Sequence, residues 1–118
     1  MKAIKVIDGK AALQEAEIPT IGPNDILIRI KATAANRADL MQKKGLYPPP
    51  PGASEILGLE CSGIVDAVGN KVTSRKVGDE VCALLAGGGY AEYVACPEFQ
   101  AIPKPTNLNW DEAASLPE

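Results

Sequence analysis

Glycine and proline interrupt this chain so often that only short elements fit between them. The 118 residues include 11 glycines and 10 prolines, with a proline run at 48–51 and a glycine run at 87–89. Proline has no backbone N–H to give to a helix or a sheet, and glycine supplies the conformations that tight turns need. The proline run therefore excludes a central strand or helix at 48–51, and the glycine run predicts a turn.

Most segments between these interruptions have the pattern of β-strands. The isoleucines at 26, 28 and 30 alternate with mixed residues, as a half-buried antiparallel strand requires. The pair Asp8-Gly9 separates two strand-like runs, at 3–7 and 11–18, and predicts a hairpin. Further strands are predicted at 56–68, 81–86, 90–96 and 99–102, with a turn at 77–80. Glycines at 58, 63 and 69 indicate bulges or close backbone approaches in this region.

Two segments have helical character instead. Residues 36–44 place apolar side chains at helical spacing and end at Gly45, a plausible C-cap. A second short helix is predicted up to residue 116, because Asn109 and Glu112 have the spacing of a capping box. Many short strands and few short helices predict a mainly β, barrel-like domain of one unit.

Composition excludes several functional classes. The chain has no histidine, which excludes Ser-His-Asp catalysis and histidine metal ligation within it. The net charge of −3 and the few aromatic residues (one Trp, three Tyr, one Phe) do not favour nucleic-acid binding. The sequence contains no apolar run of about 20 residues, so no membrane-spanning helix is predicted. The three cysteines form no C-x-x-C pair, so reduced thiols and a cytoplasmic location are expected.

An ordered set of motifs along the chain resembles a known family. The motifs are ANRADL at 35–40, GLYPPP at 45–50, LGLECSG at 57–63, VGDEV at 77–81, GGGYAEYV at 87–94 and EAASLP at 112–117. Together they resemble the zinc-independent quinone oxidoreductases, the zeta-crystallin-like branch of the medium-chain dehydrogenase/reductase superfamily. The resemblance implies a GroES-like, partly open β-barrel over residues 1–118, with two or three short helices. In such enzymes a Rossmann domain follows, binds NADPH and forms the active-site cleft with this domain. No G-x-G-x-x-G motif occurs in these 118 residues, so the Rossmann domain is expected to be absent from them.

The resemblance also implies a site without metal. Asn36 and Leu59 stand where zinc-dependent relatives carry cysteine and histidine ligands, and neither side chain can replace such a ligand. Zinc binding is therefore not expected. In the zinc-free branch the asparagine lies near nicotinamide and substrate, which makes Asn36 a candidate catalytic residue. The alternative is that Asn36 caps the helix at 36–44 with Asp39 as its partner.

Tyr47 is the second candidate catalytic residue. It matches a family tyrosine beside cofactor and substrate, and its hydroxyl would donate to a quinone oxygen as negative charge develops there. Packing on the proline run is the alternative. Asp39, Met41, Leu59 and Glu60 are candidates for lining the substrate and cofactor pocket. The alternative for Met41 is that it fills a gap in the core.

Glu60 and the glycine run each have two interpretations. Glu60 is an acid in an apolar segment, either a proton donor or orienting residue, or one partner of a structural ion pair with a residue such as Arg37. The glycines at 87–89 either cradle a phosphate or form a hairpin turn with positive φ angles.

The sequence as a whole predicts the substrate-side domain of an NADPH-dependent quinone oxidoreductase. The expected reaction is hydride transfer to a quinone or a conjugated enone, with no activity in the isolated domain. The alternative is a stand-alone GroES-like barrel that serves as a non-enzymatic binding or assembly module. No nucleic-acid or membrane partner is expected. An uncovered apolar cleft face predicts a homo-oligomer or self-association.

Overall fold

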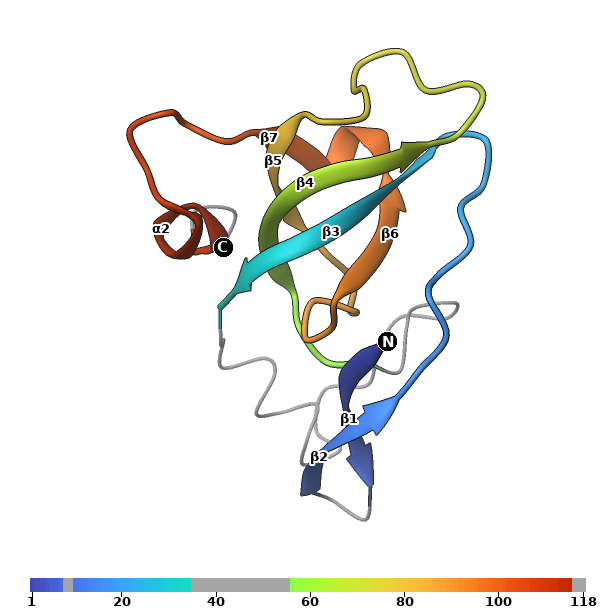
Figure 1. Ribbon diagram of the computed structural model, residues 1–118, viewed down its shortest axis with the longest axis vertical. Coiled ribbons are helices and arrows are strands. Elements are labelled where there is room, and N and C mark those ends of the chain that lie inside the picture. The colour runs from blue at the N-terminus through green and yellow to red at the C-terminus, as the bar shows by residue number, and fades with distance from the viewer. Residues whose placement is uncertain (8–9, 35–55, 116–118) are drawn as a thin grey trace.

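A five-stranded antiparallel sheet forms the body of the domain (Figure 1). The computed structural model describes residues 1–7, 10–34 and 56–115. The strand order is β6-β3-β4-β5-β7. These strands are β3 (Asp25–Thr33), β4 (Glu60–Val68), β5 (Glu80–Leu84), β6 (Tyr93–Pro97) and β7 (Ala101–Pro103). A separate antiparallel hairpin pairs β1 (Lys2–Ile7) with β2 (Lys10–Glu15).

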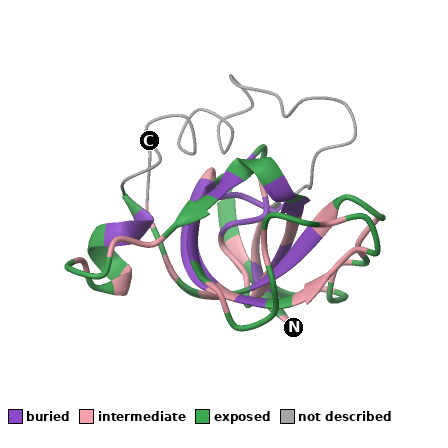
Figure 2. Cartoon of the chain, turned by 90° about the horizontal axis from the view of Figure 1, so that it is seen from above, coloured by how far each residue is buried: buried purple, intermediate pink, exposed green. Residues whose placement is uncertain are grey.

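Strand β3 lies between β4 and β6 and follows the predicted alternation from Ile28 onward, whereas Leu27 is buried together with its neighbours. Ile26 and Ile28 are fully buried, whereas Arg29 and Lys31 are exposed. Burying an isoleucine side chain contributes about 1.5–3 kcal/mol. The core that these residues enter is aliphatic and contains, besides them, Cys61, Val65, Val81, Ala83, Leu85, Val94, Cys96 and Ala101. Figure 2 shows the buried positions gathered along the curved sheet, with exposed residues mainly on loops and strand ends.

The hairpin prediction at the N-terminus is confirmed, although β2 ends at Glu15 and not at residue 18. Its turn at Asp8-Gly9 lies outside the described residues. Isolated bridges from Ala3 to Ala91 and from Lys5 to Ile56 join the hairpin to the rest of the domain. Because the order of the main sheet runs linearly from β6 to β7, the described sheet is not closed. The prediction of a mainly β, partly open barrel is therefore confirmed.

The predicted strand at 56–68 is shorter than expected. Strand β4 begins only at Glu60. The reason is Gly58, whose φ of 111° is incompatible with an extended strand. The predicted close approach at Gly63 is confirmed, since a Cβ there would meet the backbone of Arg29 on β3.

The predicted hairpin around the glycine run is wrong. Strand β5 pairs with β4 and β7, whereas β6 pairs with β3, so the segment 85–92 crosses between strands that are not neighbours. Positive φ angles at Gly87 and Gly88 are nevertheless present, at 150° and 96°. The turn at 77–80 leads into β5 as predicted.

The predicted strand at 99–102 is only partly correct. Glu98–Gln100 form a short 3-10 helix, η1, and the strand β7 begins at Ala101. Glu98 explains this difference. Its buried carboxylate accepts a hydrogen bond from the Thr73 N–H at 3.0 Å, which holds η1 against the loop that precedes β5.

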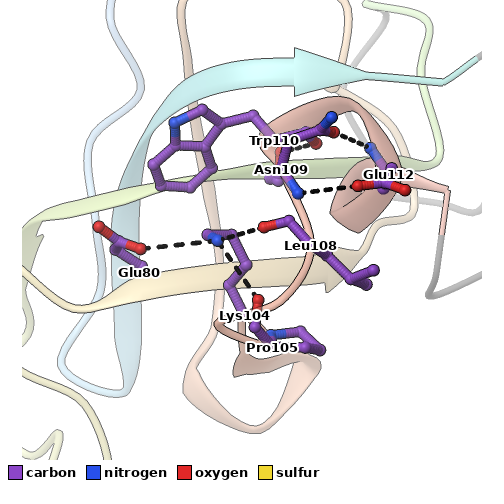
Figure 3. A network of polar contacts seen from close by, with 8 residues as sticks. Glu80, Lys104, Pro105, Leu108, Asn109, Trp110 and Glu112 are labelled. Carbon is purple, nitrogen blue, oxygen red and sulfur yellow. Dashed lines mark hydrogen bonds and ion pairs between the residues drawn. The ribbon is translucent and has the colours of Figure 1, made fainter.

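The capping box is confirmed. Helix α2 spans Trp110–Ala114, and the Asn109 side chain accepts from the Glu112 N–H at 2.8 Å while the Glu112 carboxylate accepts from the Asn109 N–H at 3.1 Å (Figure 3). The loop before α2 closes around Lys104, whose ammonium donates to the Leu108 carbonyl at 2.6 Å and lies 5.1 Å from the centre of the Trp110 ring. The predicted helix at 36–44 lies outside the described residues.

Strand β7 is the last strand of the described sheet, and the main-chain groups of Ala101 that face away from β5 already have partners. The Ala101 N–H donates to the Glu98 carbonyl, and the Ala101 carbonyl accepts from the Arg75 guanidinium at 2.7 Å. Pro103, at the end of the strand, has no N–H. This edge is therefore occupied by the chain itself.

Candidate functional site

Two of the predicted site residues, Leu59 and Glu60, lie in the described part of the chain. They stand at the entrance to β4, next to each other, with Leu59 half-buried and Glu60 only 1% exposed. The other four, Asn36, Asp39, Met41 and Tyr47, lie outside the described residues, as does Arg37, the suggested ion-pair partner of Glu60. The roles of all six stay predictions.

Glu60 is fixed by both of its neighbouring strands. It lies opposite Leu84 in the β4–β5 ladder, and its carbonyl accepts a hydrogen bond from the Thr33 hydroxyl on β3 at 2.7 Å. The expectation of a buried carboxylate is confirmed. A carboxylate removed from water in this way acts strongly on charges near it.

The Glu60 side chain lies on the face of the sheet opposite the core. Side chains alternate along a strand, so Glu60 and Ser62 share one face, and Cys61 between them joins the core cluster on the other. Helix α2 covers the face that carries Glu60 and Ser62. The buried Ser62 hydroxyl donates to the Trp110 carbonyl at 2.6 Å, and Ala113 and Ala114 are fully buried. Glu60 is thus buried beside a helix-covered surface and not within the aliphatic core.

Burial raises the pKa of all three cysteine thiols. For Cys61, neighbouring thiols and the Glu60 charge add to the effect of burial. For Cys82, which lies opposite Ser62, Glu60 raises the pKa further and Lys104 opposes it. Burial, with a smaller contribution from Asp25, raises the pKa of Cys96 to about 12. The thiols are free, buried and protonated at neutral pH, so none of them is an activated nucleophile.

These thiols should make the domain less stable in alkali. The Cys96 thiol has an ordinary pKa of 9.0 and a raised one of about 12 in the folded chain. Its contribution is constant below pH 9. From pH 9 to about 12 the unfolded chain loses a proton that the folded chain keeps, which lowers the free energy of unfolding by up to about 1.4 kcal/mol per pH unit. Urea unfolding of Cys96→Ala and the parent chain at pH 7.5, 9 and 10.5 should show a shallower decline for the variant. Parallel declines would contradict this assignment.

The glycine run at 87–89 does not cradle a phosphate. The backbone N–H groups that a phosphate would need already donate within the chain, from Gly88 to the Ile56 carbonyl at 2.8 Å and from Gly89 to the Gly58 carbonyl at 3.0 Å. Gly88 and Gly89 are also buried. The run is a packing element against the segment that carries Leu59 and Glu60.

The described residues do not fit a whole nicotinamide dinucleotide. Its diphosphate is typically bound by the N–H groups at a helix N-terminus. In residues 1–7, 10–34 and 56–115, α2 is the only α-helix, and its first turn carries the acids Asp111 and Glu112. These charges repel a diphosphate. The same residues contain no group of three or more metal-ligating side chains placed to hold an ion.

Sequence reasoning missed the residues that position this site. Thr33 and Ser62 fix the entrance of β4 and the helix over it. The close approach predicted at Gly58 is confirmed, but its partner, Gly89, was not identified. Ser62 had a readable signal, since a polar residue two positions after Glu60 continues the same face of a strand. Thr33 had none, because its partner is a backbone carbonyl on another strand.

No helix in the described ranges has both the length and the apolar character needed to cross a membrane.

Comparison with known proteins gives a consistent set of relatives. Residues 22–106 match the family model described as the alcohol dehydrogenase GroES-like domain. The chain is 38% identical to the synaptic vesicle membrane protein VAT-1 homolog of Danio rerio over 97% of its own length and 22% of the relative. It is 30% identical to the quinone oxidoreductase of Mus musculus over 98% of its own length and 37% of that relative.

A solved structure agrees with this result. The structure of Escherichia coli quinone oxidoreductase complexed with NADPH matches with a TM-score of 0.87 and 28% identity, over 98% of this chain and 37% of that one. The chain thus spans between about a fifth and two fifths of the length of these relatives. With the family model matched over most of its length, the chain belongs to the alcohol dehydrogenase GroES-like domain family of the medium-chain dehydrogenase/reductase superfamily.

Proposed function

We propose that this domain forms the substrate-side wall of a quinone oxidoreductase that uses NADPH. The observation that carries the proposal is the likeness to quinone oxidoreductases over nearly the whole chain, one of them solved with NADPH. The dinucleotide would be held mainly by another domain, because the described residues provide no place for its diphosphate. Residues 1–118 would then be one domain of a larger protein.

The proposed reaction converts a quinone into a hydroquinone, or reduces the double bond of a conjugated enone. When bound, the nicotinamide supplies the hydride, and a proton from solvent or a donor group completes the reduction. The task of this domain is to hold the substrate and to stabilise the negative charge that develops on its oxygen. We assign that task to Asn36 and Tyr47, with Asp39, Met41, Leu59 and Glu60 lining the pocket.

The reaction is proposed to need no zinc, and the protein is proposed to act in the cytoplasm. The absence of histidine from the chain and the identities of Asn36 and Leu59 support the first point. Elemental analysis of the purified chain after dialysis against a chelator tests it, and zinc retained at near-stoichiometric amounts would contradict it.

A chimera tests the proposed function directly. In it, residues 1–118 replace the matched part of E. coli quinone oxidoreductase, so that the remainder of that enzyme supplies the NADPH site. We expect the chimera to oxidise NADPH with quinones and the 118-residue chain alone to show no rate above background, because hydride transfer needs donor and acceptor held about 3–3.5 Å apart. The measurement is the loss of NADPH absorbance.

Two results would contradict the proposal. Turnover by the 118-residue chain alone would show that it needs no second domain. A folded chimera that binds NADPH but reduces no quinone or enone would favour the non-enzymatic module instead.

A further inference from the structure

The backbone that leads into Glu60 is held from the side by the crossover between β5 and β6. The segment 56–59 is not a strand, yet each of its four carbonyl groups accepts a hydrogen bond from an N–H group between residues 85 and 90. The bonds run from Gly88 to Ile56 (2.8 Å), Tyr90 to Leu57 (2.8 Å), Gly89 to Gly58 (3.0 Å) and Leu85 to Leu59 (2.7 Å). The following carbonyl, of Glu60, accepts from the Thr33 hydroxyl.

The two segments approach so closely that no side chain fits between them unless the backbone shifts. A Cβ on Gly58 would lie 2.7 Å from the Gly89 Cα and 2.6 Å from the Tyr90 nitrogen. A Cβ on Gly89 would lie 3.1 Å from the Gly58 carbonyl and 3.1 Å from the Glu60 carbonyl oxygen. Both glycines are buried. The position of one backbone therefore fixes the position of the other.

The two glycines differ in one respect that makes Gly89 the better probe. Gly58 has a φ of 111°, so any side chain there strains the backbone as well as the contact. Gly89 has no such conformation, and a methyl group there requires its neighbours to move by only a few tenths of an ångström. That movement falls on Gly58 and Glu60.

We propose that Gly89 is a positioning residue, which through its contact with Gly58 and Glu60 sets where Leu59 and Glu60 stand and so how well the pocket wall fits a quinone. Only the part of this inference that concerns the fit of a quinone rests on the proposed function. Leu59 follows Gly58 directly and precedes β4, and Glu60 is the first residue of the β4 ladder, so these two residues are the first that a shift of the Gly58 backbone reaches.

The test compares Gly89→Ala with Gly22→Ala in the 118-residue chain. Gly22 is a matched control: a Cβ there also meets an atom at 3.1 Å, but that atom is the carboxylate end of the Asp25 side chain, which can move away. Amide and methyl NMR spectra report the positions of residues 58–60. We expect Gly89→Ala to shift the amides of 58–60 and the Leu59 methyl groups, and Gly22→Ala to leave them in place.

A titration of the chimera with duroquinone, with and without Gly89→Ala and followed at the Leu59 methyl groups, gives the second readout. We expect the dissociation constant to rise roughly fivefold in Gly89→Ala, since a wall displaced by part of an ångström loses part of its van der Waals contact with the quinone, and to change less than twofold in Gly22→Ala. A merely structural role would lower the melting temperature without changing this affinity at temperatures where the variant is fully folded.

The outcomes separate the two proposals. Unchanged signals at 58–60 in folded Gly89→Ala overturn the positioning role, whatever the affinity. Shifted signals with an unchanged affinity overturn its link to the pocket. A chimera that does not bind duroquinone counts against the proposed function, while the NMR shifts in the 118-residue chain still decide whether Gly89 positions Leu59 and Glu60. If Gly89→Ala does not fold, Thr33→Val removes the hydrogen bond that holds the Glu60 carbonyl from the β3 side and should shift the amides of 58–60. Thr33→Ser keeps the hydroxyl and should leave the parent spectrum unchanged.

Discussion

Replacing Gly63 by alanine should remove about 3–5 kcal/mol from the free energy of unfolding, a large share of the roughly 5–15 kcal/mol that a domain of ordinary stability has. A Cβ at this position would meet the Arg29 carbonyl group and lie 2.7 Å from the Ile28 Cγ2 atom. Both belong to the central strand β3, and Ile28 is fully buried. The β4 backbone cannot move away from β3 without breaking the hydrogen bonds of the β3–β4 ladder. The clash therefore cannot be relieved at a small cost in free energy. Urea unfolding followed by circular dichroism measures the loss.

Gly78→Ala is the control that separates lack of space from backbone conformation. Gly78 has a φ of 96°, but a Cβ there would meet nothing within 4 Å. Its substitution should cost only the conformational penalty of about 1–2 kcal/mol. If Gly78→Ala destabilises the chain more than Gly63→Ala does, close packing between β3 and β4 is not what requires glycine at residue 63.

Tyr47→Phe should lower kcat of the chimera by about tenfold while changing KM much less. The reason is that the hydroxyl is proposed to act on charge that develops only in the transition state. Removing one such donor from a preorganised site costs about 10²-fold or more. We expect a smaller loss because Asn36 and water share the task. Tyr47→Phe combined with Asn36→Ala should therefore exceed either single change. The measurement is steady-state NADPH oxidation with several quinones.

Leu108→Ala provides a control for general damage to the domain. Leu108 is half-buried in the loop before α2, and its contact with Lys104 is made through its backbone carbonyl, which alanine retains. It should leave kcat near the parent value. If Tyr47→Phe and Asn36→Ala, singly and together, leave kcat/KM unchanged, the assignment of both residues to the site is wrong.

The parts of the fold that could be predicted from the sequence are those governed by local patterns. The alternation at 26–32 predicts β3, and the spacing of Asn109 and Glu112 predicts the cap of α2, because each signal lies within a few residues. The glycine run predicts positive φ angles for the same reason. Which strands pair is not local information, and the wrong prediction of a hairpin at 87–89 shows this. The run connects β5, which lies next to β4, to β6, which lies next to β3, and β5 and β6 do not pair with each other.

The candidate site shows the same division. A buried acid at residue 60 could be predicted from its apolar neighbours, and the structure places it as expected. The contacts that hold it, from the Thr33 hydroxyl and from the crossover at 85–90, come from segments about 25 residues away in either direction along the chain. No spacing rule connects such segments, so these positioning residues become visible only when the backbone is in place.

The occupied edge of β7 affects how copies of this domain can meet. Phe99 and Ile102, beside that edge, are 82% and 44% exposed, which would make a free strand there an attractive template for another chain. With the Ala101 N–H and carbonyl bonded to Glu98 and Arg75, and with Pro103 lacking an N–H, neither residue offers an N–H group with which a second copy could extend the ladder. Contacts at this end must therefore be made by side chains, which favours limited, reversible complexes over the open-ended growth of a fibril.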